Sequence, residues 1–291
     1  MNPPSAGPGL ARELARHAYA LEASGYTVLP AQINGSELQE MRRAADEALA
    51  AAQRVLQAGG KLSQTGGTAY YWGSRCLYCW SEACVRLLEH ETIHALAGAL
   101  MGSYRLWDMG VSSARPVPAH EKEATTSWHR DFDGLVHGAR VPGYLWFFLC
   151  LDDVTAENGA TWVVPGSHHA ASRFEPESKG VWTGDDLSAY PSRIQLTGRA
   201  GDLLVLNPTL LHTSGRNATS RPRTLINVAV CQGELQPLLD HWTVAGPGIQ
   251  ERASEKLRKL LGADLPARPA TWEGLPEGWI TATGAVGASA P

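Results

Sequence analysis

The spacing of apolar residues predicts a helical first third of the chain. They recur at helical spacing before Gly25, at Leu10, Leu14, Ala18 and Leu21. A short strand is predicted over 26–29, and a capping box over 36–39 opens an alanine-rich helix that runs to about Gly59. After a loop rich in glycine, Trp80-Ser81 begins a further helix that ends at Gly102.

From Tyr104 onward the period changes to that of β-strands. Short segments rich in β-branched and aromatic residues are predicted as strands, and turn signals such as Asn158-Gly159 separate them. The predicted strands are 104–113, 126–132, 143–151, 160–165, 193–197, 202–206, 210–213 and 223–231. Helices followed by such strands predict a mostly β fold with flanking α-helices, a double-stranded β-helix of the jelly-roll or cupin-like type.

The chain has 291 residues, and 44% of them are hydrophobic, which is enough for one sizeable core. We predict a single domain over 1–280. It comprises a helical N-terminal part over about 7–102, a jelly-roll core over about 103–232 and a last helix near 249–261. The tail 281–291 carries no charge and no periodicity, and is predicted to be disordered.

Charge and composition exclude several classes of partner. A net charge of −4 without a basic stripe gives no reason to expect nucleic acid. The longest apolar run, 144–151, is too short to cross a bilayer, and the first residues lack the features of a signal peptide. Five cysteines in no disulfide spacing favour a reducing cytoplasm. We therefore expect a cytoplasmic protein that binds neither nucleic acid nor membrane; its oligomeric state is left open.

Cys76, Cys79 and Cys84 form a cluster that has two interpretations. Zinc or redox chemistry is one, but a structural zinc site needs four ligands and the sequence supplies no obvious fourth. Buried free thiols are the other and simpler interpretation.

The strand predicted over 126–132 carries the triplet His129-Arg-Asp131. Alternate residues of a strand point to the same face, so the imidazole and the carboxylate can share one ion. His212 ends a later predicted strand and can add a second imidazole. Two histidines and one carboxylate that leave coordination positions open suit the Fe(II) of an oxygenase, so these three residues are the predicted catalytic metal ligands.

Arg223 lies at the start of the last predicted strand, where it shares a face with Leu225 and Asn227. An arginine beside a metal is costly to bury unless it meets an anion, and its planar fork matches a carboxylate. This favours Arg223 as the anchor of a 2-oxo acid, against the alternative of a surface ion pair. Arg216 and Arg221 lie in the predicted turn and are weaker candidates.

These elements together resemble the phytanoyl-CoA dioxygenase superfamily, which includes ectoine hydroxylase. The resemblance spans about 128–231. It rests on Trp128-His129-Arg130-Asp131-Phe132, on Glu157-Asn158-Gly159 running to Pro165-Gly166-Ser167-His168, and on His212-Thr213-Ser214 followed by Arg223.

The resemblance implies a double-stranded β-helix, Fe(II), and the co-substrates 2-oxoglutarate and O2. It implies the roles given above for the three ligands and Arg223, and suggests that Ser214 supports the 2-oxoglutarate carboxylate. Ser112 and Ser113, before the triplet, are further candidates to hydrogen-bond 2-oxoglutarate. The implied reaction oxidises a small molecule, a specialised metabolite or an amino-acid-derived compound, and releases succinate and CO2. The alternatives are a cupin-like metal enzyme without 2-oxoglutarate and a non-catalytic jelly-roll binding protein.

Residues that contact the primary substrate are expected outside the barrel core. Tyr71, Trp72 and Arg75 follow a glycine-rich loop and could form a lid over the substrate, or an edge packed on the barrel. Asp133 shares the predicted face of His129 and could bind a polar substrate group or end the strand as a turn residue. His168 is expected to make a structural hydrogen bond in its turn.

Overall fold

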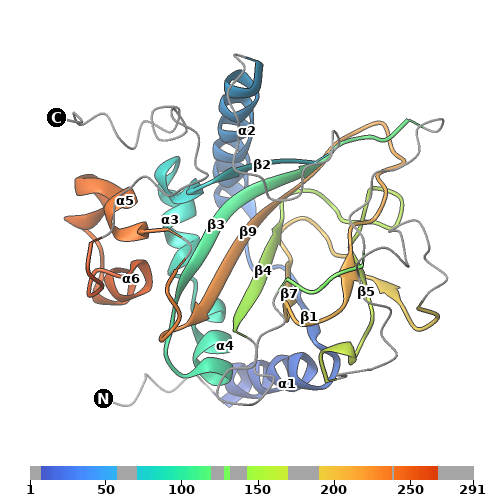
Figure 1. Cartoon of the computed structure of the whole chain (residues 1–291), viewed down its shortest axis with the longest axis horizontal. Helices are drawn as coiled ribbons and strands as arrows, with labels where there is room; N and C mark the ends of the chain where they lie inside the picture. Colours follow the sequence, from blue (N-terminus) through green and yellow to red (C-terminus); the bar gives the residue numbers. More distant parts are fainter. Residues whose placement is uncertain are drawn as a thin grey trace.

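The computed structural model describes residues 8–57, 71–118, 128–131, 143–169, 190–237 and 239–267 (Figure 1). The α-helices are α1 (Pro8–Ser24), α2 (Gly35–Gln57), α3 (Glu82–Leu88), α4 (Glu91–Met101), α5 (His241–Gln250) and α6 (Glu255–Leu261). The strands are β1 (Tyr26–Leu29), β2 (Tyr71–Arg75), β3 (Tyr104–Ala114), β4 (Tyr144–Cys150), β5 (Trp162–Val163), β6 (Ile194–Gln195), β7 (Leu203–Leu206), β8 (His212–Thr213) and β9 (Arg223–Gln232).

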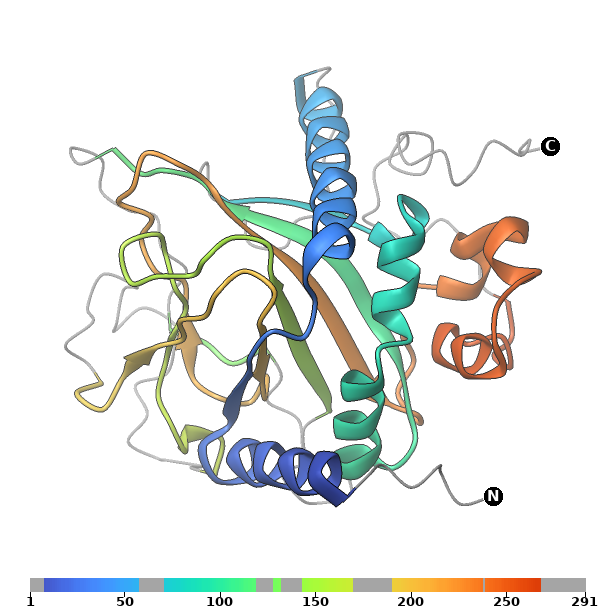
Figure 2. The same cartoon turned by 180° about the vertical axis from the view of Figure 1, so that it is seen from behind.

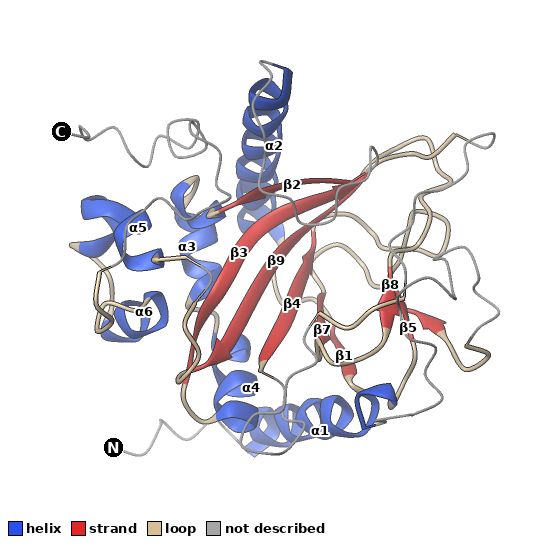
Figure 3. Cartoon of the chain, viewed as in Figure 1, coloured by secondary structure: helices blue, strands red, loops and turns tan. Residues whose placement is uncertain are grey.

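The described strands form two antiparallel sheets. The main sheet has the order β1-β7-β4-β9-β3-β2, and the small sheet has the order β6-β5-β8. Figure 3 shows β5 and β8 to one side of the twisted main sheet, beyond β7 and β1. Non-consecutive neighbours in both sheets mean that the chain crosses repeatedly between them, as the predicted jelly roll requires.

Strand alternation gives the main sheet two different faces. Leu145, Phe147 and Leu149 of β4 are buried in the large core shared with the helices, and Figure 2 shows α2, α3 and α4 lying across that face. Trp146 and Phe148 point to the opposite face, which we call the inner face. The register places Asn227 and Leu225 of β9 beside Phe148 and Cys150 on the inner face.

The longest ladder of the main sheet joins β3 to β9. An irregularity between Leu106 and Asp108 places Trp107 as an extra residue in β3, and Asp108 then pairs with Ala229. At the sheet edge, β2 pairs with β3 from Tyr71 opposite Ala114 to Arg75 opposite Gly110. The segment around Tyr71 therefore forms an edge strand, the second of its two predicted arrangements.

Two predicted helices are in fact broken. The helix predicted from Trp80 to Gly102 is two helices, because Ser81 caps α3 and His90 begins α4 after a turn. The helix predicted near 249–261 is also wrong in extent. Its residues belong to the end of α5 and to α6, and Ser254 caps α6 by accepting a hydrogen bond from the amide of Leu257.

The strand predicted over 126–132 is reduced, within the described residues, to a single bridge between His129 and His212. The tail 281–291 lies outside the described residues, and the single-domain organisation stays a prediction. Within the part of the chain that the structure describes, no helix is both long enough and apolar enough to span a bilayer.

Candidate metal centre

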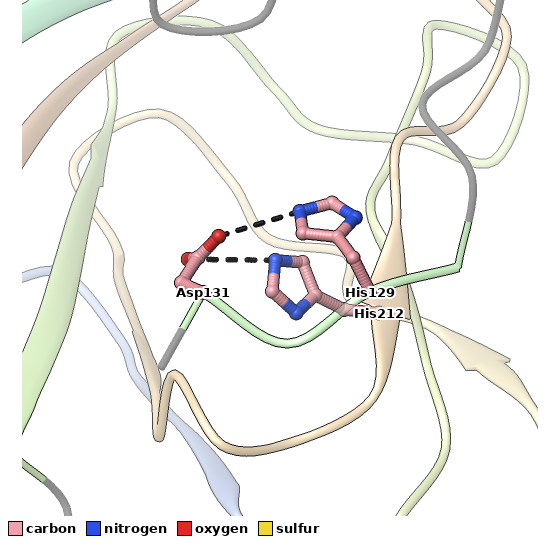
Figure 4. A group of neighbouring side chains, drawn as sticks. All are labelled: His129, Asp131 and His212. Atoms are coloured by element: carbon pink, nitrogen blue, oxygen red, sulfur yellow. Dashed lines mark ion pairs between the residues drawn. The ribbon is translucent and has the colours of Figure 1, made fainter. Parts of the chain in front are cut away.

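Backbone hydrogen bonds bring the HxD triplet against the segment that ends at His212. The amides and carbonyls of His129 and His212 bond to each other in both directions at 3.0 Å, and the Asp131 amide donates to the Pro208 carbonyl at 3.0 Å. The side chains converge as Figure 4 shows. Asp131 Oδ1 lies 3.3 Å from His129 Nε2, and Asp131 Oδ2 lies 3.6 Å from His212 Nε2.

The surroundings of His212 and Asp131 favour the charge states that bind a metal. Burial lowers the pKa of His212 against the pull of Asp131, so its ring tends to be neutral. Burial also opposes ionisation of Asp131. The nearby histidines and the hydrogen bonds from His129 and Trp146 outweigh that effect and hold the pKa of Asp131 below its usual value. Neutral imidazoles and an ionised carboxylate are the ligand forms a divalent cation requires.

The geometry of the three residues fits a single ion. His212 Nδ1 lies 2.8 Å from the Leu210 carbonyl, which it can meet only as a donor, so Nε2 keeps its lone pair for a metal. One ligand atom from each residue lies within 4.8 Å of the others. An ion about 2.1 Å from each ligand would hold neighbouring ligands roughly 3 Å apart, so only a small contraction is needed. Two histidines and one carboxylate are the donor set of non-haem Fe(II).

Trp146 of β4 contacts the predicted metal ligand Asp131 and was not identified from the sequence. Its indole Nε1 donates a hydrogen bond to Asp131 Oδ2 at 2.8 Å. The ring is held by Phe148, stacked with centroids 5.5 Å apart, and by the edge contact of Tyr144 at 5.8 Å. A carboxylate bonded in this way presents a defined orientation to the ion.

We expect Trp146→Phe to weaken binding of Co(II) or Fe(II) by about 10-fold, because it removes the N–H and keeps an aromatic ring. Calorimetric titration of the metal measures the effect. Trp128→Phe is the matched control, since Trp128 adjoins His129 but its indole N–H makes no hydrogen bond in the structure. Equal metal affinities of Trp146→Phe and the wild type would contradict the role of this hydrogen bond.

Arg223 is the buried arginine of the three predicted candidates. It is 4% exposed, and its Nη2 donates to the Gly159 carbonyl at 2.5 Å. Gly159 adopts a positive φ, and a Cβ there would lie 2.9 Å from the Gly215 carbonyl oxygen, so this turn accepts only glycine without strain. Arg216 instead donates to the carbonyls of residues 117 and 118, and Arg221 is exposed.

The two serines of β3 lie on opposite faces of the sheet. Ser112 pairs with Leu225 on the inner face, and its hydroxyl donates to Asn227 Oδ1 at 3.2 Å. Ser113 pairs with Thr224, whose hydroxyl lies 3.4 Å from its own, on the face away from Leu225. The register therefore favours Ser112 over Ser113 for contact with 2-oxoglutarate. The role of Ser214, two residues after His212 and half-buried, stays a prediction.

The structure places the remaining candidates as follows. Arg75 is buried and forms an ion pair with Asp108, with Nη1 and Oδ2 2.5 Å apart. Tyr71 and Trp72 have described backbone only, Asp133 lies outside the described residues, and their contacts with substrate stay predictions. His168 makes the structural bond expected of it, to the Glu22 carbonyl at 2.8 Å.

The cysteine cluster consists of free thiols, the simpler of its two interpretations. Cys76 and Cys84 are buried, Cys79 is half-buried, and all three are free thiols. Burial raises the pKa of Cys79 and of Cys84 to about 12, so both stay protonated at neutral pH.

The sequence model of the phytanoyl-CoA dioxygenase (PhyH) family matches residues 21–225. The chain belongs to this family. The match includes the metal triad, and it ends two residues after Arg223.

Three comparisons place this family member among its relatives. An L-proline trans-4-hydroxylase from Streptomyces griseoviridis is 29% identical over 168 residues, which are 50% of this chain and 61% of that protein. The epimerase SnoN from nogalamycin biosynthesis is similar in structure, with a TM-score of 0.57, 22% identity and coverage of 92% and 93% of the two chains. HygX from Streptomyces hygroscopicus, solved with nickel and 2-oxoglutarate, has a TM-score of 0.57, 18% identity and coverage of 76% and 88%.

These comparisons confirm the predicted family and the predicted jelly-roll fold. The enzyme class predicted from the sequence, a 2-oxoglutarate-dependent non-haem iron dioxygenase, and its cofactors are those of the family and its neighbours. The chain spans less than two thirds of the length of the L-proline hydroxylase, so its own reaction is taken up below as a proposal.

Proposed function

We propose that this protein is an Fe(II)- and 2-oxoglutarate-dependent dioxygenase that hydroxylates or otherwise oxidises a small molecule, with release of succinate and CO2. The observation that carries the proposal is the convergence of His129, Asp131 and His212 on one point. The buried Arg223 adds an anion-binding group at the start of β9. A bound Fe(II) would supply O2-dependent oxidation chemistry, with 2-oxoglutarate as the source of two electrons.

Each residue has a definite task in this proposal. The two imidazoles and the carboxylate hold the ion on one side and leave its other positions for 2-oxoglutarate and O2. Trp146 fixes the orientation of the Asp131 carboxylate through its N–H. Arg223 pairs with the distal carboxylate of 2-oxoglutarate. Hydrogen bonds between a guanidinium and a carboxylate are charge-assisted and are therefore stronger than hydrogen bonds between neutral groups.

We propose a specialised metabolite or an amino-acid-derived compound as the primary substrate. The support comes from relatives of both kinds, the L-proline hydroxylase and the epimerase from nogalamycin biosynthesis. Because identity to both is below 30%, they indicate a range of small molecules and no single one. The cytoplasmic location expected from the sequence stays a prediction.

Anaerobic titration separates this function from its two rivals. We expect a weak visible absorption band to appear only when the protein, Fe(II) and 2-oxoglutarate are all present under nitrogen. A cupin-like enzyme without this co-substrate would bind iron and show no change on adding 2-oxoglutarate. A binding protein would take up neither. Absence of the band with iron bound would therefore reject the 2-oxoglutarate step specifically, and the same solution exposed to air should release succinate.

A further inference from the structure

One peptide group lies immediately before the strand that carries His212. It consists of the carbonyl of Leu210 and the amide of Leu211. Strand β8 begins at His212, and the Leu211 carbonyl already accepts from the Val164 amide at 3.0 Å, as part of the pairing of the small sheet. The peptide group before that carbonyl lies outside the ladder. Because its N–H and C=O are buried polar groups, they need partners other than a neighbouring strand.

Both ends of this peptide group make buried hydrogen bonds at 2.8 Å. The Leu210 carbonyl accepts from Nδ1 of His212, and the Leu211 amide donates to the hydroxyl oxygen of Ser167. In a trans peptide the C=O and N–H bonds point in opposite directions within one plane. The hydroxyl of Ser167 and the imidazole therefore lie on opposite sides of the same peptide group. A rotation of that group would break the bond to Ser167 and move the carbonyl that the imidazole contacts.

The Leu210 carbonyl determines how His212 is presented to a metal. Nδ1 can contact the carbonyl only as a donor, so the lone pair of Nε2 is left for the ion. Figure 4 shows one ring nitrogen of His212 directed to Asp131 and the other directed away from it. If the carbonyl moved, the ring would turn with it, and Nε2 would leave the point that the three ligands share.

Ser167 lies in a turn that is attached to the end of α1. The Gly166 amide donates to the Ser24 carbonyl at 3.0 Å, and the buried His168 bonds through Nε2 to the Glu22 carbonyl at 2.8 Å. Ser167 itself is buried between these two residues. Its hydroxyl is therefore held at a fixed place, from which it can hold the peptide group in turn.

Gly25, the residue after α1, brings this turn and the segment before His212 together. Its φ is +84°, and a Cβ there would lie 2.6 Å from Leu210 Cδ1 and 2.7 Å from His168 Nδ1. Its carbonyl also accepts from the Asn207 amide at 2.8 Å. Only glycine allows so close an approach at a positive φ. The end of α1 thus contacts the turn on one side and the segment that leads to the metal ligand on the other.

We propose that Ser167 is a positioning residue for the metal ligand His212, and that it acts through the peptide group of residues 210–211. The proposal rests on the metal centre proposed above. Without the hydroxyl, the Leu211 amide would be a buried donor without a partner, which favours rotation of the peptide group toward another acceptor. Donation from this amide also polarises the peptide group, so the Leu210 carbonyl becomes a stronger acceptor for the imidazole.

Titration of the metal-free, full-length protein with Co(II) tests this role. We expect Ser167→Ala to bind Co(II) about 10-fold more weakly than the wild type, the lower end of the range for loss of a group that supports a ligand. Calorimetry measures the affinity. The visible absorption of the Co(II) complex should change as well, because it depends on the arrangement of the ligands around the ion. An unchanged Co(II) affinity in Ser167→Ala would overturn the proposal.

A matched serine separates this role from a general loss of stability. The hydroxyl oxygen of Ser254 also accepts from a backbone amide, that of Leu257 at 3.1 Å, where it caps α6. Ser254→Ala should lower the melting temperature, while its Co(II) affinity and visible absorption stay those of the wild type. If Ser254→Ala weakens Co(II) binding as much as Ser167→Ala does, the effect is one of stability alone, and the proposal is rejected.

Ser167→Thr tests the hydroxyl itself. This variant keeps the acceptor, so its Co(II) affinity should be close to that of the wild type. Binding as weak as in Ser167→Ala would show that the hydroxyl is not the group that matters, and would contradict the proposal. Failure of the metal centre is recognised separately. A wild type that binds no Co(II) rejects the centre and the role of Ser167 together, whereas equally tight binding by the wild type and Ser167→Ala rejects only the role of Ser167.

Discussion

Replacing His129, Asp131 or His212 with alanine is expected to reduce turnover below detection and to weaken Fe(II) or Co(II) binding by more than about 100-fold. Loss of a supporting hydrogen bond alone costs roughly 10- to 100-fold in metal affinity, and loss of a ligand costs more. The chain should stay folded, because His129 and His212 hold each other through backbone hydrogen bonds that survive removal of the side chains. On the same preparations, calorimetric titration measures metal affinity, succinate release measures turnover, and the melting temperature shows whether the chain is folded.

His169→Ala provides the matched control for these variants. This histidine is exposed, and its Nε2 lies 2.6 Å from the Glu22 carbonyl near the end of α1. Its replacement should change neither metal binding nor turnover. If any of the three triad variants keeps near wild-type activity with iron supplied, the ligand assignment is wrong.

Arg223→Ala is expected to raise the concentration of 2-oxoglutarate needed for half-maximal succinate release by at least ~100-fold. A charge-assisted, bidentate contact to a buried carboxylate is worth about 3 kcal/mol, and each 1.36 kcal/mol is a factor of ten. The variant also leaves the Gly159 carbonyl without the donor that it has in the wild type. Iron binding without 2-oxoglutarate should be unaffected, which separates this effect from damage to the metal centre.

Arg221→Ala is the control for the co-substrate anchor. Arg221 is exposed and lies two residues before Arg223, so its removal changes the net charge equally without touching the buried position. Its 2-oxoglutarate requirement should change much less. A larger effect of Arg221→Ala than of Arg223→Ala would move the anchor to the turn.

The fold could be predicted where one period persists over several residues. The bounds of β1 and nearly all of β3, β4 and β9 follow from runs of β-forming residues. The break between α5 and α6 could not be predicted in this way. The apolar spacing continues through Ser254 as in one helix, whereas Ser254 in fact caps the start of a new helix. The edge strand β2 owes its conformation to its pairing with β3, a contact that no local pattern reports.

The metal ligands could be predicted because their chemistry is carried by residue type and spacing. The supporting residues could not, because the stretch 144–150 is almost uniformly apolar and does not show which side faces the site. The sequence could not show which of Ser112 and Ser113 faces 2-oxoglutarate for the same reason, because it does not show which face of the sheet each one points to. A shift of one residue in register exchanges the two faces of a strand, and only the pairing with β9 decides it.

The alternation of β4 has a consequence for how this protein can diversify. Leu145, Phe147 and Leu149 are committed to the helices, while Trp146 and Phe148 face the chemistry. The two sets of side chains on this strand therefore serve separate purposes: one packs in the core, and the other lines the inner face of the sheet. Exchanges on the inner face can therefore be made while the side chains that pack against the helices stay unchanged. A combinatorial library restricted to the residues of the inner face, and sparing Trp146, should therefore change the free energy of unfolding little.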